Sequence, residues 1–262
     1  MKKRFIAVLD SGIGGLSVFS ELYRRLPNEC YLYFGDTKNV PYGSKSEDEL
    51  ASITEKNLEF IFDSGMRSGG EIKAVVVGCN TLSVGILGEV APKFDVPMFG
   101  VYPDAKGSVG NTIIFCTPLT AKKLLKTHGY PRTVRVVPLK DLAADIEKNK
   151  FDLSRADIKK HFYGNNELDA ALDAFRGEVD TVILGCTHYV FVKRVFVDHF
   201  KPQAVTSGNH ATANRVHYCL KKNGLCENDK EFTIDFIGDA AEENLKFYKK
   251  VVKPRLNFKE KN

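Results

Sequence analysis

The chain has 262 residues, of which 43% are hydrophobic and 27% are charged, as in an ordinary globular protein. Its formal net charge is +5, and the Lys and Arg residues are scattered except near the two ends. This pattern argues against nucleic-acid binding, which needs a clustered basic surface. No apolar run approaches the roughly 20 residues that cross a membrane, so no membrane partner is expected.

Six cysteines are spread along the chain without any C-x-x-C pair, which argues against a zinc ribbon or a disulfide framework. A reduced, cytoplasmic location is therefore expected, and no metal site is predicted. The basic start leads into an apolar stretch that is broken at Asp10, which is typical of a first strand and not of a signal peptide.

Buried-strand patterns alternate with helical patterns along the chain. Strands are predicted at 5–9, 30–34, 72–77, 98–101, 111–116, 133–137, 179–184, 203–205 and 232–237. Helices are predicted at 15–26, 46–67, 82–93, 118–128, 139–148, 164–176, 189–200, 209–223 and 239–250. Apolar strands that alternate with helices of this length indicate an α/β fold with mostly parallel sheets, covered by helices on both faces.

Two short segments repeat each other at an interval of 107 residues, and each carries one cysteine. The sequence VVVGCNT at 75–81 predicts a buried strand that ends in a polar turn, and VILGCTH at 182–188 predicts the same. Asp10 and Thr117 also stand 107 residues apart, each at the end of a further strand. The repeat predicts two pseudo-symmetric α/β domains. The first comprises residues 1–99 plus 209–262, and the second comprises residues 100–208.

Ligands of parallel sheets bind beyond the carboxyl ends of the strands, where Asp10, Cys79, Thr117 and Cys186 all lie. The glycine-rich turn DSGIGGL at 10–16 exposes backbone N–H groups at a helix N-terminus, which is a natural anion site. Its spacing is neither a dinucleotide fingerprint nor a P-loop, so a carboxylate is favoured over a phosphate. The alternative is that Asp10 only caps the following helix.

A second loop, at 34–43, is able to offer the Tyr42 hydroxyl and a backbone N–H group to a ligand, although an ordinary loop is the alternative.

Each matched cysteine ends a strand directly before a helix. A helix N-terminus stabilises a thiolate, and the ordinary cysteine pKa of about 8.5 must fall for a thiol to act as a base near neutral pH. His188, two residues after Cys186, is placed to relay or stabilise a proton. A Cys–His hydrolase would leave the second thiol unexplained. Two facing thiols therefore suggest a two-base proton transfer at one carbon.

Four stretches resemble motifs of the glutamate racemase family, in the cofactor-independent aspartate/glutamate racemase superfamily. They are residues 10–16, residues 34–37 with 41–43, residues 78–81 and residues 184–189, in the family's order and spacing. The resemblance implies that the site lies between the two domains and that the substrate is glutamate. It also implies interconversion of the L and D enantiomers without a cofactor, which would supply D-glutamate for peptidoglycan.

The resemblance also implies the roles of individual residues. Cys79 would deprotonate D-glutamate with the assistance of Asp10, and Cys186 would deprotonate L-glutamate with the assistance of His188. Further residues would bind the substrate; they are Ser11, Pro41, Tyr42, Gly43, Asn80, Thr81, Thr117, Thr120, Glu147 and Thr187, beside Asp10, Cys79, Cys186 and His188 themselves. Glu147 matches a family acidic position only through a loose alignment.

Four positions depart from the family pattern: Val190 replaces a usual Pro, Thr206 an Asp, Cys116 a Gly and Leu82 a small residue. None of them removes a catalytic group, but Val190 and Leu82 leave the turnover rate and the substrate range open. The alternatives are a racemase for aspartate or another small amino acid and a non-catalytic acidic-ligand-binding paralogue. The sequence also leaves open whether the chain forms a homodimer.

Overall fold

The structure is a computed structural model that describes residues 2–103, 105–106, 108–127, 129–153, 158, 161–162, 166–175, 179–227 and 231–256. Within this part of the chain, parallel strands form a five-stranded sheet, in the order β4-β3-β1-β2-β9, and a four-stranded sheet, in the order β6-β5-β7-β8. The strands are β1 (Lys3–Asp10), β2 (Cys30–Gly35), β3 (Gly70–Val77), β4 (Met98–Gly100), β5 (Thr112–Cys116), β6 (Val134–Pro138), β7 (Thr181–Gly185), β8 (Ala204–Ser207) and β9 (Thr233–Ile237). The predicted α/β fold class is confirmed.

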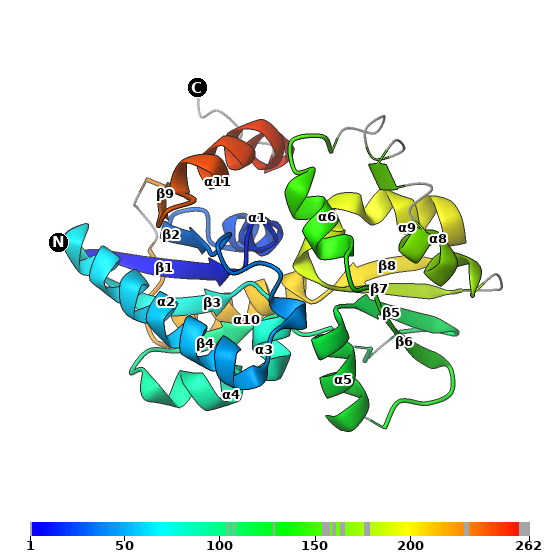
Figure 1. Ribbon diagram of the computed structural model, residues 1–262. Coiled ribbons are helices and arrows are strands. Elements are labelled where there is room, and N and C mark those ends of the chain that lie inside the picture. Colours follow the sequence, from blue (N-terminus) through cyan, green and yellow to red (C-terminus); the bar gives the residue numbers. More distant parts are fainter. Residues whose placement is uncertain are drawn as a thin grey trace.

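Helices cover both faces of the first sheet, so the central strand β1 is buried along almost its whole length (Figure 1). Ile6 and Val8 pack on one side with α1 (Gly15–Arg25) and α10 (Asn209–Lys222). Ala7 and Leu9 pack on the other side with α2 (Glu47–Arg67). Side chains of a strand alternate between the two faces, so an unbroken apolar run fits a sheet that is buried on both sides.

The second sheet is built in the same way. Ile114 and Ile183 face α5 (Pro118–Thr127). Phe115 and Leu184 face the opposite layer, which contains α6 (Leu142–Lys148), α8 (Asn166–Asp173) and α9 (Lys193–Phe200). The two central strands, β1 and β5, therefore occupy equivalent places in two similar layered units.

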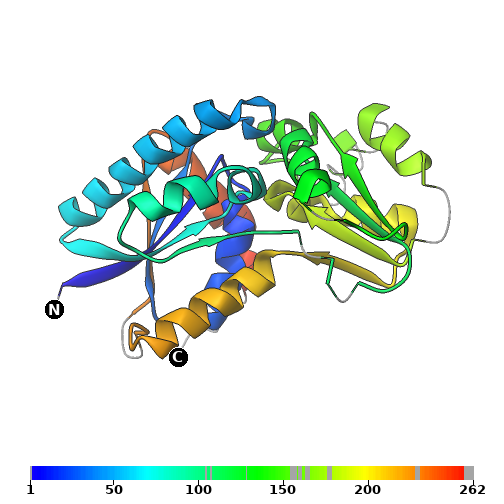
Figure 2. The same cartoon turned by 90° about the horizontal axis from the view of Figure 1, so that it is seen from below.

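The chain crosses from the first sheet to the second after β4 and returns after β8 (Figure 2). The two crossings touch, because a Cβ atom at Gly208 would lie 3.0 Å from the backbone N and C atoms of Tyr102. Beyond α10, β9 pairs with β2, and α11 (Ala241–Phe247) packs against both strands. A π-helical turn, Tyr248–Val252, and a 3-10 turn, Lys253–Leu256, follow α11. The assignment of whole segments to two domains stays a prediction.

Each predicted strand is found, with small shifts at its ends. Two helices differ from the prediction. In place of one helix over 82–93, the chain forms α3 (Asn80–Gly85), α4 (Leu87–Val90) and a 3-10 turn, Ala91–Lys93, with non-helical backbone at Ile86. In place of one helix over 189–200, a 3-10 turn, Thr187–Val192, precedes α9. Apolar spacing could not reveal either break, because a short helical turn and a longer helix share similar spacing.

Smaller differences concern the starts and ends of two other helices. The helix predicted at 139–148 begins at Leu142, and the one predicted at 239–250 covers Ala241–Phe247 before it becomes a π-helical turn. Residues 128, 164, 165 and 176 of the predicted helices lie outside the described residues.

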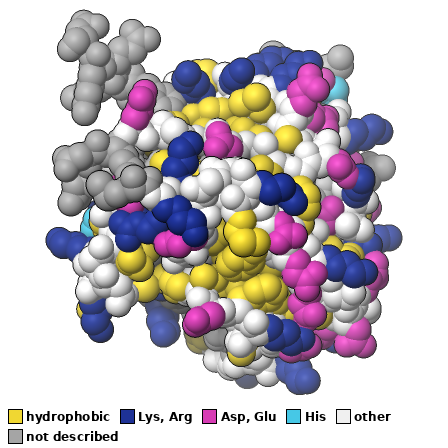
Figure 3. Space-filling model, turned by 90° about the vertical axis from the view of Figure 1, so that its left-hand side faces the viewer, with side chains coloured by type: hydrophobic (Ala, Val, Ile, Leu, Met, Phe, Trp, Pro, Cys, Tyr) yellow, Lys and Arg dark blue, Asp and Glu magenta, His cyan; other side chains and the backbone are white. Residues whose placement is uncertain are grey.

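Acidic and basic side chains are interspersed among apolar ones on the face shown in Figure 3. Several surface lysines have acidic partners; Lys45 lies 2.8 Å from Glu49, for example, and Lys93 lies 2.5 Å from Glu55. None of the described helices combines the length and the apolar character that crossing a membrane requires.

Candidate active site

The two matched cysteines occupy equivalent places at the ends of two equivalent strands. Cys79 follows β3 and is the N-cap residue of α3, and Cys186 follows β7 and is the N-cap residue of the 3-10 turn. Both strands lie next to the central strand of their sheet. Each cysteine is only 6% exposed. The two halves of the chain therefore present one buried thiol each from the same position of the fold.

Two opposing influences act on the Cys79 thiol. Its burial raises its pKa, and the negative charge of Asp10 adds to that rise. The N–H groups of Leu82 and Thr81 act in the opposite direction, as expected at a helix N-terminus. Burial outweighs them, so the thiol holds its proton more strongly than an exposed cysteine does. The expected lowering by the helix is present but is not the dominant effect.

Asp10 lies at the end of β1 and is fully buried. The Gly12 N–H donates to its Oδ1 atom at 2.9 Å, and the Thr187 hydroxyl donates to its Oδ2 atom at 3.3 Å. Burial raises the pKa of Asp10, although the positive charge of His188 and the Gly12 N–H oppose that rise. The N-cap residue of α1 is Gly14, so the alternative that Asp10 only caps this helix is wrong. The Asp10 carboxylate instead binds the turn and reaches Thr187 of the second half.

The second thiol has an imidazole beside it. Cys186 Sγ lies 3.9 Å from Nδ1 of His188, and the opposite ring nitrogen, Nε2, lies 2.9 Å from Oε2 of Glu147. Burial lowers the pKa of His188, but its bonds to Cys186 and Glu147 outweigh burial and hold that pKa well above its ordinary value. The contacts of His188 with Cys186 and Glu147 therefore favour the protonated form of its ring.

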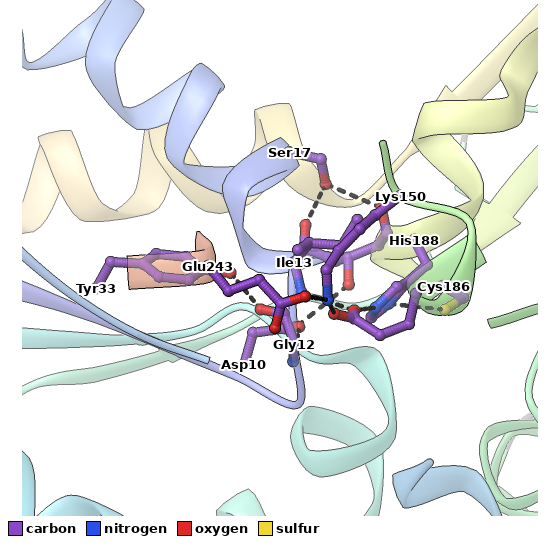
Figure 4. A network of polar contacts seen from close by, with 12 residues as sticks. Asp10, Gly12, Ile13, Ser17, Tyr33, Lys150, Cys186, His188 and Glu243 are labelled. Atoms are coloured by element: carbon purple, nitrogen blue, oxygen red, sulfur yellow. Dashed lines mark hydrogen bonds and ion pairs between the residues drawn. The ribbon is translucent and has the colours of Figure 1, made fainter. Parts of the chain in front are cut away.

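Glu147 contacts three of the residues that Figure 4 labels, Ile13, His188 and Lys150. Its Oε2 atom accepts a hydrogen bond from the Ile13 N–H at 2.9 Å, in addition to the contact with His188. Its Oε1 atom lies 2.8 Å from Nζ of Lys150. Burial acts to raise the pKa of Glu147, but the His188 and Lys150 contacts and the Ile13 N–H together lower it to about 2. Geometry thus places in the site a residue that the sequence aligned only loosely.

The glycine-rich turn of the first half lies directly against the second half. A Cβ atom at Gly14 would lie 2.5 Å from both His188 Nδ1 and Thr187 Oγ1, which no real side chain tolerates. Only glycine permits this approach. The turn contacts carboxylates of the protein itself, through the N–H groups of Gly12 and Ile13.

Three threonine hydroxyls connect the two halves on the other side of the site. Thr81 Oγ1 lies 3.0 Å from Thr117 Oγ1, which lies 3.0 Å from Thr120 Oγ1. Thr81 belongs to α3 and Thr120 to α5, so this chain of hydroxyls joins helices that cover different sheets. Gly43 packs closely against the Thr117 side chain.

The remaining predicted residues lie near these groups with different partners. Ser11 is buried, and the amide nitrogen of Asn80 donates to the Val101 carbonyl at 3.0 Å. The Asn80 Oδ1 atom is buried without a hydrogen-bond partner among the described residues. The Tyr42 hydroxyl donates to Asp36 at 2.6 Å and is thus engaged within its own loop, beside the half-buried Pro41.

Sequence reasoning missed several polar residues of the site. Lys150 contacts Glu147 and Glu243, and Ser17 contacts the carbonyls of Gly14 and Thr187 at 2.8 and 3.1 Å. Lys150 stands three residues after Glu147, a spacing that indicates contact near a helix end, whereas nothing local indicates Glu243. The described residues contain no group of three or more His, Cys, Asp and Glu side chains arranged to hold a metal ion.

Solved structures that match this fold over most of the chain include racemases. The glutamate racemase of Thermus thermophilus, in complex with β-chloro-D-alanine, matches with a TM-score of 0.71 and 28% identity, over 94% of this chain and 93% of that one. The Escherichia coli glutamate racemase matches with a TM-score of 0.75 over 97% and 95% of the two chains; at 22% identity it supports the fold alone.

Relatives found by sequence show which kind of racemase this chain resembles. The glutamate racemase of Clostridium botulinum (strain Alaska E43 / Type E3) is 32% identical over 96% of this chain and 98% of its own. That of Clostridium novyi (strain NT) is 33% identical over 94% and 96%. No protein-family model matches the chain. The chain belongs to the glutamate racemase family.

Proposed function

We propose that this chain interconverts L- and D-glutamate by direct proton transfer and so supplies D-glutamate for peptidoglycan synthesis. The observation that carries the proposal is the pair of buried thiols at equivalent strand ends, each with its own ionisable neighbour. Membership of the glutamate racemase family supports the same substrate.

In the proposed reaction Cys79 removes the α-proton of D-glutamate, and Cys186 delivers a proton to the opposite face of the carbon. The reverse direction begins at Cys186. A buried thiol must first lose its own proton, and Asp10, whose pKa is raised, is placed to influence that step for Cys79. On the other side, protonated His188 stabilises negative charge on the Cys186 sulfur at 3.9 Å.

Substrate binding is proposed to use the polar groups between the two sheets. The orphaned Asn80 Oδ1 would accept a hydrogen bond from the substrate ammonium group. Hydroxyls and backbone N–H groups would bind the two carboxylates. The hydroxyls come from Ser11, Thr81, Thr117, Thr120 and Thr187, and the N–H groups from Tyr42 and Gly43. Pro41 has neither group and would only shape this loop. Donors held in place around the α-carboxylate stabilise the charge that develops when the α-proton leaves.

The burial of both thiols implies that glutamate enters only when the two halves separate. Opening would break the contacts between Ile13 and Glu147 and between Thr81 and Thr117. Closing would remove water and bring both sulfurs to opposite faces of the α-carbon.

Incubation with D-glutamate in D2O, without added cofactor, tests the proposal. Optical rotation and the α-proton NMR signal would be followed together, with D-aspartate and D-alanine in parallel. Loss of both signals, fastest with D-glutamate, is the expected result. Faster exchange with D-aspartate or D-alanine would assign another substrate, and a folded protein that exchanges none of them would contradict a racemase function.

A further inference from the structure

Lys150 is a buried cation that the proposed proton transfers do not use. Its side chain is 8% exposed, and its Nζ atom lies 2.8 Å from Glu147 Oε1 and 3.2 Å from Glu243 Oε1. A buried ammonium group is costly unless it is paired. Glu147 precedes it by three residues, but Glu243 comes from α11, which packs against β2 and β9 of the first sheet. The lysine therefore joins the two halves.

The two carboxylate oxygens of Glu147 have different partners. Oε1 is held by Lys150, and Oε2 is held by the Ile13 N–H and by His188 Nε2. A carboxylate that is held at one oxygen cannot rotate freely about its Cγ–Cδ bond. Lys150 therefore keeps Oε2 directed at His188, whose other nitrogen faces Cys186 (Figure 4).

We propose that Lys150 is a positioning residue for the Cys186 side of the site: it fixes Glu147, and through Glu147 the His188 ring. It is not a catalytic residue, because its partners are carboxylates and not the thiol or the imidazole. Glu243 completes the arrangement from α11, so His188 is held in place when the two halves are closed. The inference rests on the proposed function for its kinetic consequence but not for its geometry.

A purely structural ion pair is the competing explanation, and the chain contains a matched example of one. Lys73 is also buried, with its Nζ atom 2.5 Å from Glu29 Oε2 and 3.9 Å from Glu227 Oε1. Glu29 directly precedes β2, so this cluster lies near the amino ends of the strands, away from the thiols. Lys73→Met therefore reports the loss of a buried ion pair without an effect on His188.

The first measurement is the downfield 1H NMR signal of the His188 Nε2 proton, which the Glu147 carboxylate shields from exchange. His188→Gln assigns the signal by its disappearance. The signal is expected in wild type, Lys150→Arg and Lys73→Met, and is expected to broaden or vanish in Lys150→Met. Glu243→Gln, at a half-exposed position that tolerates substitution, is expected to weaken it. An unchanged signal in folded Lys150→Met and in Glu243→Gln would overturn the proposal.

The second measurement compares isotope effects in the two directions with α-deuterated glutamate. Enantiomers have equal free energies, so kcat/KM must stay equal in both directions for every variant. The isotope effects need not stay equal. If Lys150→Met slows transfer at Cys186, the effect on L-glutamate rises and that on D-glutamate falls. We expect kcat to decrease up to about 100-fold, because a misplaced His188 ring weakens charge stabilisation during proton transfer, with KM nearly unchanged.

The outcomes separate this inference from the proposed function. Isotope effects of Lys150→Met that match those of wild type in both directions would overturn the kinetic consequence, and Lys150→Arg should keep the wild-type values. If wild type racemises no glutamate but the NMR signal responds as expected, the proposed function fails while the positioning role stands. If wild type is active and the signal does not respond, the positioning role fails alone.

Discussion

The two halves of the molecule share a strand order but differ in the chemistry at equivalent strand ends. In the first half β4, β3, β1 and β2 lie in the order that β8, β7, β5 and β6 follow in the second. Cys79 begins an α-helix and has a carboxylate, Asp10, as its charged neighbour. Cys186 begins a 3-10 turn and has an imidazole, His188, which Glu147 supports.

This difference gives the two thiols opposite electrostatic surroundings. A buried carboxyl with a raised pKa accepts a proton readily, whereas a histidine with a raised pKa carries one and stabilises an anion beside it. In the proposed reaction each thiol takes a proton in one direction and gives one in the other, and the two sides do so with different neighbours. The repeated fold places the two thiols at equivalent positions. Their charged neighbours differ, a carboxyl group beside Cys79 and an imidazole beside Cys186.

Substitution of either thiol should have the largest effect. Cys79→Ser and Cys186→Ser are each expected to reduce racemisation by about 1,000-fold or more, because a serine hydroxyl is a far weaker acid than a thiol. Polarimetry that starts from D-glutamate and from L-glutamate measures the loss of racemisation. Cys219→Ser, at a partly exposed position, is the control and should retain wild-type activity. Near-normal turnover in either of the first two variants would contradict the two-base assignment.

A substitution in the glycine-rich turn tests the contact between the halves. Gly14→Ala should lower activity about 100-fold, since its Cβ atom would displace His188 and Thr187 by a substantial fraction of an ångström. Overpacking should also cost about 1–3 kcal/mol of unfolding free energy, measured by urea denaturation. Gly88→Ala, where the added Cβ meets no atom within 4 Å, is the matched control. Similar activities of the two variants would show that the close approach is unimportant.

The charge of Glu147 should be visible in the pH dependence of stability. Its pKa is lowered from 4.5 to about 2 in the folded state, so its contribution is present above about pH 4.5 and is lost as the pH falls toward 2. The pKa of His188 is raised above 6.5, so its contribution is present below 6.5 and is lost as the pH rises through the folded-state value.

Wild type should therefore exceed Glu147→Gln in stability most clearly between about pH 4.5 and 6.5. Thermal unfolding of both proteins from pH 2 to 9 measures this window. Glu55→Gln, which removes only a half-buried surface partner of Lys93, should follow the wild-type curve. A difference between wild type and Glu147→Gln that does not vary with pH would contradict the charged pair.

A substitution in the chain of hydroxyls formed by Thr81, Thr117 and Thr120 should have the smallest effect on activity. Thr81→Val removes the contact with Thr117 and should raise KM for glutamate several-fold, in line with about 1 kcal/mol for one hydrogen bond. Thr54→Val, which removes a buried hydroxyl bonded to the Leu50 carbonyl, is the control. That variant should lose stability but keep its KM. Equal KM values for the two variants would exclude a role for Thr81 in binding.

The sequence predicted the parts of this molecule that depend on local pattern. The strands follow from apolar runs, and the 107-residue repeat places Cys79 and Cys186 at equivalent positions. It did not predict the Lys150–Glu243 contact, because those residues are far apart in the chain and meet only through folding. Nor did it predict that burial would raise the pKa of Cys79, since burial depends on how closely the halves pack.

Three of the positions that depart from the family pattern lie in different parts of the structure. Leu82 is fully buried in the apolar cluster between the first sheet and α2, so it belongs to the core of its half. Val190 lines a pocket of about 580 Å³ with Ser17 and Asn209, next to α1 and α10. Cys116 is fully buried and packs closely against Gly185 on the neighbouring strand. Leu82 and Cys116 thus have direct packing explanations.

The contact between Gly208 and Tyr102 has a consequence for how the protein can be rebuilt. The segment between these two residues forms the whole four-stranded sheet. This segment therefore begins and ends at nearly the same point of the molecule. In the terms of protein engineering it is a cassette with adjacent ends. Cassettes of this kind can be exchanged between relatives with short junctions. The chain could therefore combine one relative's carboxylate side with another relative's imidazole side.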